Sequence, residues 1–145
     1  MVSSVWNVLP ERFPNIELDA FVVMPNHIHG ILMIAHIDNH AVGAPLVGAR
    51  VVTGDRATTR VAPTNSNEVT LGAVIGAYKS LTTLDYIRGV KTASWPSFQK
   101  NLWQRNYYEH IIRNETSLNS IRQYISDNPA NWAWDKENPD SLCRP

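Results

Sequence analysis

The stretch IELDAFVVMPNHIHGILMIA, residues 16–35, decides the fold of this chain. Its first half alternates between polar and apolar residues and then becomes wholly apolar, as a strand entering a core does. Pro25 and Asn26 follow as a two-residue turn, a length typical of hairpins. A second apolar strand begins at once, at His27. The stretch therefore predicts one β-hairpin over residues 16–35.

The segments on either side predict helices and one further strand. Apolar residues spaced three and four apart indicate amphipathic helices, and aromatic and β-branched residues indicate a strand. The expected elements are a helix end over residues 2–9 closed by Pro10, a helix over residues 71–88 stopped by Gly89, a third strand over residues 103–113, and a helix over residues 115–128 capped by Asn114 and ended by Pro129. This order predicts an α+β fold, an antiparallel sheet with helices packed on one face.

The length of 145 residues suits one domain, and 43% hydrophobic with 18% charged residues indicates a globular protein. Residues 38–70 have no sustained period of 2 or 3.6, so we expect a flexible low-complexity insertion there. The predicted organisation is one domain over residues 1–135, carrying that insertion, and a polar tail over residues 136–145.

The composition indicates which cellular compartment and which kinds of partner to expect. The longest apolar run, residues 31–35, is too short to cross a bilayer, the N-terminus has no secretory pattern, and the single cysteine, Cys143, cannot form an internal disulfide. We therefore expect a cytoplasmic protein without a membrane partner. The net charge of zero argues against a general polyanion binder, yet basic residues outnumber acidic ones between residues 79 and 122. This segment is the candidate phosphate-binding surface.

His27 and His29 are the first candidate for chemistry. Side chains two positions apart on a strand point to the same face, so both imidazoles can hold one divalent metal ion. The alternative is that they are two strand-edge histidines hydrogen-bonded to neighbours or water, because a bare His-x-His is common.

Tyr124 and Asn128 are the second candidate. Four residues apart on the last predicted helix, they lie on one face, one turn apart. A tyrosine hydroxyl can act as a nucleophile, and an asparagine oxygen can complete a metal site. Taken alone, a tyrosine beside an apolar stripe is more often a core or interface residue.

The segment WQRNYYEH, residues 103–110, is the third candidate, because bases stack on aromatic side chains and arginines hold phosphates. Ordinary strand aromatics packed under helices explain it equally well. The sequence has no phosphate-binding glycine loop, no paired cysteines and no nucleophile elbow.

Three segments together carry a resemblance to a known family. FVVMPNHIHGIL (residues 21–32) resembles the His-hydrophobic-His (HUH) segment of bacterial REP-associated tyrosine transposases and their single-tyrosine transposase relatives. LWQRNYYEHIIRN (residues 102–114) resembles the next landmark of that family, and QYISDNP (residues 123–129) resembles its nucleophile helix. The segments occur in the family's order, and the resemblance spans roughly residues 1–135.

The resemblance implies a ferredoxin-like core and a role for each matching position. His27 and His29 match the metal ligands, Asn128 matches the residue that supplies a third, oxygen ligand, and Tyr124 matches the nucleophile. The implied cofactor is Mg²⁺ or Mn²⁺, and the implied partner is single-stranded DNA with hairpins, cut and rejoined through a 5′-phosphotyrosine. From charge, the expected DNA-binding residues are Lys79, Arg88, Arg105 and Arg113.

The chain departs from the family pattern at its start. The family's sheet begins with a strand before the first helix, whereas Met1 falls where that helix is expected. We therefore expect three strands and an open sheet edge, explained by a missed upstream start, by a strand from another chain, as in a homodimer, or by a decaying gene copy. The alternatives to the transposase are a non-cutting nucleic-acid-binding module of the same fold and a zinc hydrolase in which Tyr124 is dispensable.

Overall fold

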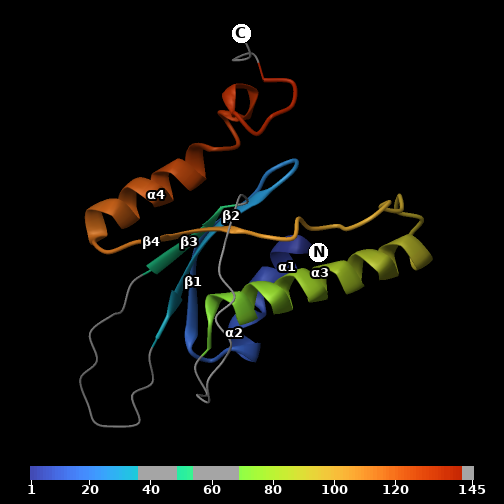
Figure 1. Ribbon diagram of the computed structural model, residues 1–145, viewed down its shortest axis with the longest axis horizontal. Coiled ribbons are helices and arrows are strands. Elements are labelled where there is room, and N and C mark those ends of the chain that lie inside the picture. The colour runs from blue at the N-terminus through green and yellow to red at the C-terminus, as the bar shows by residue number, and fades with distance from the viewer. Residues whose placement is uncertain (36–48, 54–68, 142–145) are drawn as a thin grey trace.

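The computed structural model describes residues 1–35 and 69–141, and the backbone of residues 49–53. The helices and strands follow one another in an α+β order (Figure 1). They are α1 (Val2–Asn7), α2 (Leu9–Arg12), β1 (Ile16–Val23), β2 (Ile28–Ile34), β3 (Ala49–Thr53), α3 (Leu71–Thr92), β4 (Tyr108–Ile111), α4 (Glu115–Asp127) and the 3₁₀ turn η1 (Trp132–Trp134).

The hairpin predicted over residues 16–35 is confirmed. β1 and β2 pair antiparallel, and the Met24 N–H donates to the carbonyl of His27 at 2.9 Å, which closes a loop of Pro25 and Asn26. The register shifts between Leu18 and Phe21 in β1, which is a β-bulge. The hairpin therefore carries His27 at its tip and a local bend halfway along β1.

The sheet has four strands, in the order β1-β2-β3-β4, all antiparallel. The prediction of three strands is wrong, because β3 from the expected insertion lies between β2 and β4, and β1 and β4 are the edge strands of the sheet. The prediction that residues 38–70 lack secondary structure fails at β3 for the same reason. The remainder of that segment, apart from residues 69 and 70, lies outside the described residues.

Helices cover both faces of the sheet, so the expectation of one covered face is wrong. Leu32 packs in a core with Trp6 of α1 and Tyr78 of α3, whereas its neighbour Ile31 packs with Ile125 of α4. Adjacent residues of a strand point to opposite faces, and β2 is apolar on both. Each face therefore needs its own cover, with α4 on one side and α1, α2 and α3 on the other (Figure 1).

Several predicted boundaries move for identifiable reasons. Pro10 lies in the first turn of α2 instead of ending a helix, a position where its missing N–H costs nothing. Helix α3 continues past Gly89 to Thr92. The glycine is needed for a different reason, because a Cβ at this position would lie only 2.3 Å from the ring of Trp95. Gly89 thus provides space for a tertiary contact within the helix.

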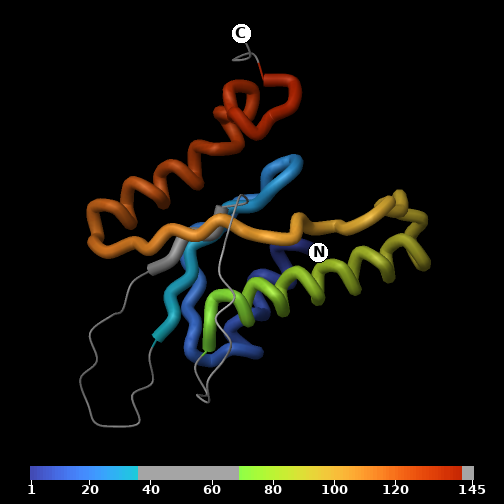
Figure 2. Tube along the Cα trace, viewed as in Figure 1, coloured from blue at the N-terminus to red at the C-terminus, as the bar shows by residue number. Residues whose placement is uncertain are grey.

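Strand β4 is shorter than predicted because the segment before it follows α3 instead (Figure 2). The indole N–H of Trp103 donates to the hydroxyl of Thr82 in α3 at 2.7 Å. Helix α4 matches its prediction closely: the side chain of Asn114 accepts from the Ser117 N–H at 2.8 Å, and the helix ends at Asp127.

No helix in the described part of the chain is both long and apolar enough to cross a membrane. Cys143 lies outside the described residues.

Candidate active site

His27 and His29 lie side by side at the tip of the hairpin, on the α4 face of the sheet. Their Nε2 atoms are 2.9 Å apart, and their rings meet edge to face with centroids 4.6 Å apart. His29 is buried, with 4% of its surface exposed, and His27 is half-buried. The spacing of two along an extended backbone places both imidazoles on one face, as the sequence predicts.

Helix α4 brings Tyr124 and Asn128 to the histidines. The amide Nδ2 of Asn128, which is 4% exposed, lies 3.1 Å from Nε2 of His29. The ring of Tyr124 lies edge to face with His29, with centroids 5.4 Å apart, and Tyr124 is 53% exposed. The four residues predicted from two distant segments therefore form one cluster, in which the tyrosine is open to solvent and the asparagine is buried.

Hydrogen bonds fix the tautomer of His27. The side-chain amide of Asn26 donates to the carbonyl of Glu137 at 2.7 Å, so its Oδ1 faces Nδ1 of His27 at 2.6 Å and accepts from it. Nε2 of His27 is then left with a lone pair. Nε2 of His29 lies 2.9 Å from Nε2 of His27 and 3.1 Å from the Asn128 amide. The lone pair of His27 therefore points into a space shared with His29 and Asn128, where a proton or a cation can lie.

Burial lowers the pKa of both histidines. It lowers the pKa of His29 to about 4, aided by the nearby His27 and opposed by Asp135. Burial also lowers the pKa of His27, although Asp135 and Glu137 act in the opposite direction. Neutral imidazoles are the form that binds metal ions.

The distances at this cluster fit a divalent ion. In an octahedral site, each ligand atom lies roughly 2.1 Å from the ion. Two neighbouring ligand atoms, at a right angle, are then roughly 3.0 Å from each other. The separations of 2.9 Å between the histidines and 3.1 Å from His29 to the Asn128 amide match this value, with Oδ1 of Asn128 rotated into the place of Nδ2. The Nδ1 of His27 donates to Asn26, as metal-bound histidines do to their outer partners.

The described part of the chain holds no group of three or more His, Cys, Asp or Glu side chains placed to bind a metal. The cluster instead offers two imidazoles and one amide. Such a set leaves coordination positions for water and phosphate oxygens, which Mg²⁺ retains or binds in most of its sites.

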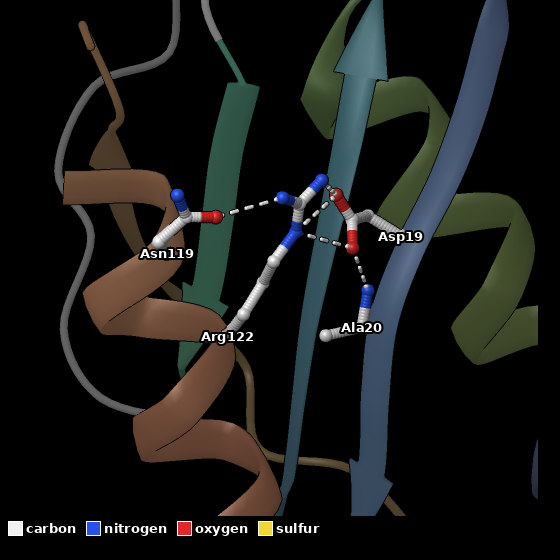
Figure 3. A network of polar contacts seen from close by, with 4 residues as sticks. All are labelled: Asp19, Ala20, Asn119 and Arg122. Atoms are coloured by element: carbon white, nitrogen blue, oxygen red, sulfur yellow. Dashed lines mark hydrogen bonds and ion pairs between the residues drawn. The ribbon is translucent and has the colours of Figure 1, made fainter. Parts of the chain in front are cut away.

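An ion pair joins α4 to β1 (Figure 3). Arg122 Nε donates to both carboxylate oxygens of Asp19 at 3.0 Å, and Nη2 donates to Oδ2 at 2.5 Å. Asp19 lies at the β1 bulge and also accepts from the Ala20 N–H at 2.7 Å. Arg122 lowers the pKa of Asp19. Because Arg122 is two residues before Tyr124, the pair fixes the rotation of the helix that carries the tyrosine.

A hollow in the surface borders Tyr124 at the end of α4. Besides Tyr124, it is lined by two carboxylates, one lysine, two amides and an indole: Asp127, Asp135, Lys136, Asn128, Asn131 and Trp134. Lys136 is a basic residue beside the tyrosine that sequence reasoning assigned to the tail. The tail is thus part of the site, both here and through the carbonyl of Glu137 that orients Asn26.

The four basic residues predicted to bind DNA do not gather at this cluster. The ammonium of Lys79 donates to the carbonyls of Gln104 at 2.8 Å and Asn106 at 2.9 Å, which gives it a structural use. Arg88 pairs with Asp85 at 3.1 Å on the exposed side of α3. Arg105 and Arg113 are exposed, before and after β4. Within the described residues, none of the four bonds to the histidines, Asn128 or Tyr124.

Sequence reasoning missed Asn26, Asp19 and Arg122. The position of Asn26 next to His27 was a usable signal, because an outer partner for a ligand is often a neighbour. The Asp19–Arg122 pair joins residues 103 positions apart, and no local pattern announces it.

Comparison with known proteins adds one relative. No family model matches the chain, and no solved structure matches it. A Haemophilus influenzae protein, whose description names no function, is 35% identical over 138 residues. The aligned region is 93% of this chain and 66% of that protein, so the chain spans slightly less than two thirds of the relative's length.

Proposed function

We propose that the chain is a metal-dependent transposase of the single-tyrosine HUH type, with a ferredoxin-like core, that cuts and rejoins single-stranded DNA. One observation carries the proposal: the Nε2 atoms of His27 and His29 are 2.9 Å apart, and Asn128 and Tyr124 close over them from α4. A metal-binding pair, a buried amide and an exposed tyrosine in one cluster are the parts that such a reaction needs.

His27, His29 and Asn128 would hold a Mg²⁺ or Mn²⁺ ion, which would polarise the scissile phosphate and stabilise charge on its non-bridging oxygens. The hydroxyl oxygen of Tyr124 attacks the phosphorus in line and loses its proton. The bond from phosphorus to the 3′ oxygen breaks, and that oxygen takes up a proton. The products are a 5′-phosphotyrosine and a free 3′-hydroxyl, and the reverse attack by another 3′-hydroxyl rejoins the strand.

The exposure of Tyr124 supports a large, open substrate. With 53% of its surface exposed beside a hollow, the tyrosine is accessible to a DNA strand without any opening of the core. Lys136 in that hollow offers a positive charge to a backbone phosphate, next to the carboxylates of Asp127 and Asp135 that also line it. The proposed substrate is single-stranded DNA with hairpins, as the resemblance implies.

A non-cutting DNA-binding module of the same fold is the second candidate. It is favoured by the absence, among the described residues, of a third His, Cys, Asp or Glu at the histidine pair. Such a module binds DNA equally well with and without metal, and its binding does not depend on Tyr124.

The test is covalent capture. Purified protein is incubated with Mn²⁺ and a labelled single-stranded hairpin from the flanks of its own gene, and a protein–DNA band that resists denaturation is sought. The band is expected from the unaltered protein and from Tyr108→Phe, which removes the hydroxyl of another exposed tyrosine, on β4. It is expected to disappear in Tyr124→Phe and in chelator.

Each outcome separates the candidates. A band that persists in Tyr124→Phe assigns the nucleophile elsewhere and refutes the mechanism. Metal-independent binding without any band from folded protein identifies the non-cutting module. Zinc-dependent strand hydrolysis that survives in Tyr124→Phe identifies a hydrolase.

A further inference from the structure

A pocket of about 350 Å³ lies on the other side of the hairpin tip from α4. Its walls are the ends of β1 and β2, helix α3 and residues 102–107. Four aromatic side chains line it: Tyr78, Tyr86, Trp103 and Tyr107. The volume is within the range of about 300–1,000 Å³ that is usual for small-ligand sites, and a lining of apolar and aromatic side chains is usual as well.

The walls of this pocket are held in place by specific bonds. Lys79 donates from α3 to the carbonyls of Gln104 and Asn106, at 2.8 and 2.9 Å, and so fixes the segment that crosses over the helix. The indole of Trp103 is fixed by its bond to Thr82. The Lys79 ammonium also lies 5.9 Å from the centre of the Tyr107 ring. The pocket is therefore preformed and carries a positive charge.

The pocket adjoins the proposed active site through His27. This residue lines the pocket, and its Nε2 faces His29 on the α4 side. Val23 also lines the pocket and is 46% exposed, which leaves apolar surface open at the end of β1. A ligand in the pocket is thus next to a residue that we assign to phosphate chemistry.

We propose that this pocket holds one unpaired nucleobase of the DNA strand, beside the phosphate that is cut; the proposal rests on the proposed function. Bases stack on aromatic side chains whatever their identity, and a nearby cation favours the attached phosphate. The exposed side chains of Gln104 and Asn106 at the rim offer amide donors and acceptors to the edge of a base. A nucleotide held there fixes the register of the strand relative to Tyr124.

The test compares two strands that differ only in their bases. Fluorescently labelled dT12 and a twelve-unit abasic strand carry the same phosphates, so the ratio of their dissociation constants reports base binding alone. Both are titrated in chelator, which removes metal and cleavage from the measurement. The unaltered protein is expected to bind dT12 about tenfold more tightly than the abasic strand.

Val23→Trp fills the pocket from its exposed edge without adding charge. Val8→Trp is the matched control, because Val8 is 43% exposed, at the junction of α1 and α2, and does not line the pocket. Val23→Trp is expected to remove most of the tenfold preference, and Val8→Trp is expected to keep it. Circular dichroism confirms that both variants are folded.

The proposal is overturned if the unaltered protein has no preference for dT12, or if both tryptophan variants retain it or lose it alike. These outcomes are independent of the covalent-capture test. A preference that Val23→Trp removes, with no covalent band from any protein, leaves a base pocket and refutes the proposed chemistry. A band with an unchanged preference in Val23→Trp retains the chemistry and refutes the pocket.

Discussion

The buried His29 makes the stability of the metal-free protein depend on pH in a window that can be calculated. Its pKa is about 4 in the folded chain, against an ordinary value of 6.5. The folded pKa is the lower one, so between these values the unfolded chain binds more protons. Stability is therefore full above pH 6.5, decreases as the pH falls through that value, and stops decreasing below pH 4.

The magnitude follows from the two pKa values. Between pH 7.5 and pH 5 the proton linkage at His29 amounts to about 2 kcal/mol, and the whole shift to about 3 kcal/mol. Typical domains are stable by about 5–15 kcal/mol, so the loss is readily measurable. Asp19 does not interfere, because Arg122 lowers its pKa from 3.8 and its own window lies at lower pH.

The assay is urea unfolding in chelator at pH 7.5 and pH 5, followed by tryptophan fluorescence. The unaltered protein is expected to lose about 2 kcal/mol more than His29→Gln, which cannot take up the proton. An equal loss in both proteins would show that His29 is not the linked group. Should His29→Gln unfold on its own, NMR titration of the His29 imidazole in the unaltered protein measures the pKa directly, and a value near 6.5 refutes the reasoning.

Two further predictions concern packing and the anchor of α4. Gly89→Ala is expected to destabilise by about 1–3 kcal/mol, because the new methyl group meets the Trp95 ring, whereas Gly76→Ala, with open space around it, is expected to stabilise by about 0.5–1 kcal/mol; thermal unfolding measures both. Asp19→Asn is expected to accelerate amide exchange across α4 relative to α3, because Arg122 loses its partner, and lowering the pH through the folded pKa of Asp19 is expected to do the same.

The hairpin and the last helix were predictable because their signals are local. Alternation, a two-residue loop and a capping asparagine act within a few residues, and each is confirmed in β1, β2 and α4. The end of α3 was not predictable in this way. Gly89 is a common stop signal, but here its missing side chain admits Trp95, and the helix continues to Thr92.

Strand β3 and the second covered face depend on long-range pairing. β3 is placed by hydrogen bonds to β2 and β4, and nothing in the surrounding sequence has a strand period. The sequence of β2, however, indicates that a helix covers the second face of the sheet. A strand apolar at both Ile31 and Leu32 is typical of burial on both faces, which argues against helices on one face alone.

In the candidate site, too, features with a local sequence signal were predictable and features that depend on long-range contacts were not. Offsets of two for the histidines and four for Tyr124 and Asn128 correctly predict which side chains share a face. The partners of Lys79 could not be predicted. The carbonyls that it binds belong to the segment that crosses over α3, and only the folded chain brings that segment to the lysine. A lysine in a basic segment is therefore weaker evidence for a DNA surface than its charge suggests.

The position of His27 links both proposals through one geometrical fact. Successive residues of β2 face opposite sides of the sheet, so the side with His29 leads to Tyr124, while the side with Ile28 leads to the aromatic pocket. His27 lies at the tip, before this separation begins, and borders both. On these two proposals, a strand with one base in the pocket passes over the hairpin tip, next to His27, to reach Tyr124.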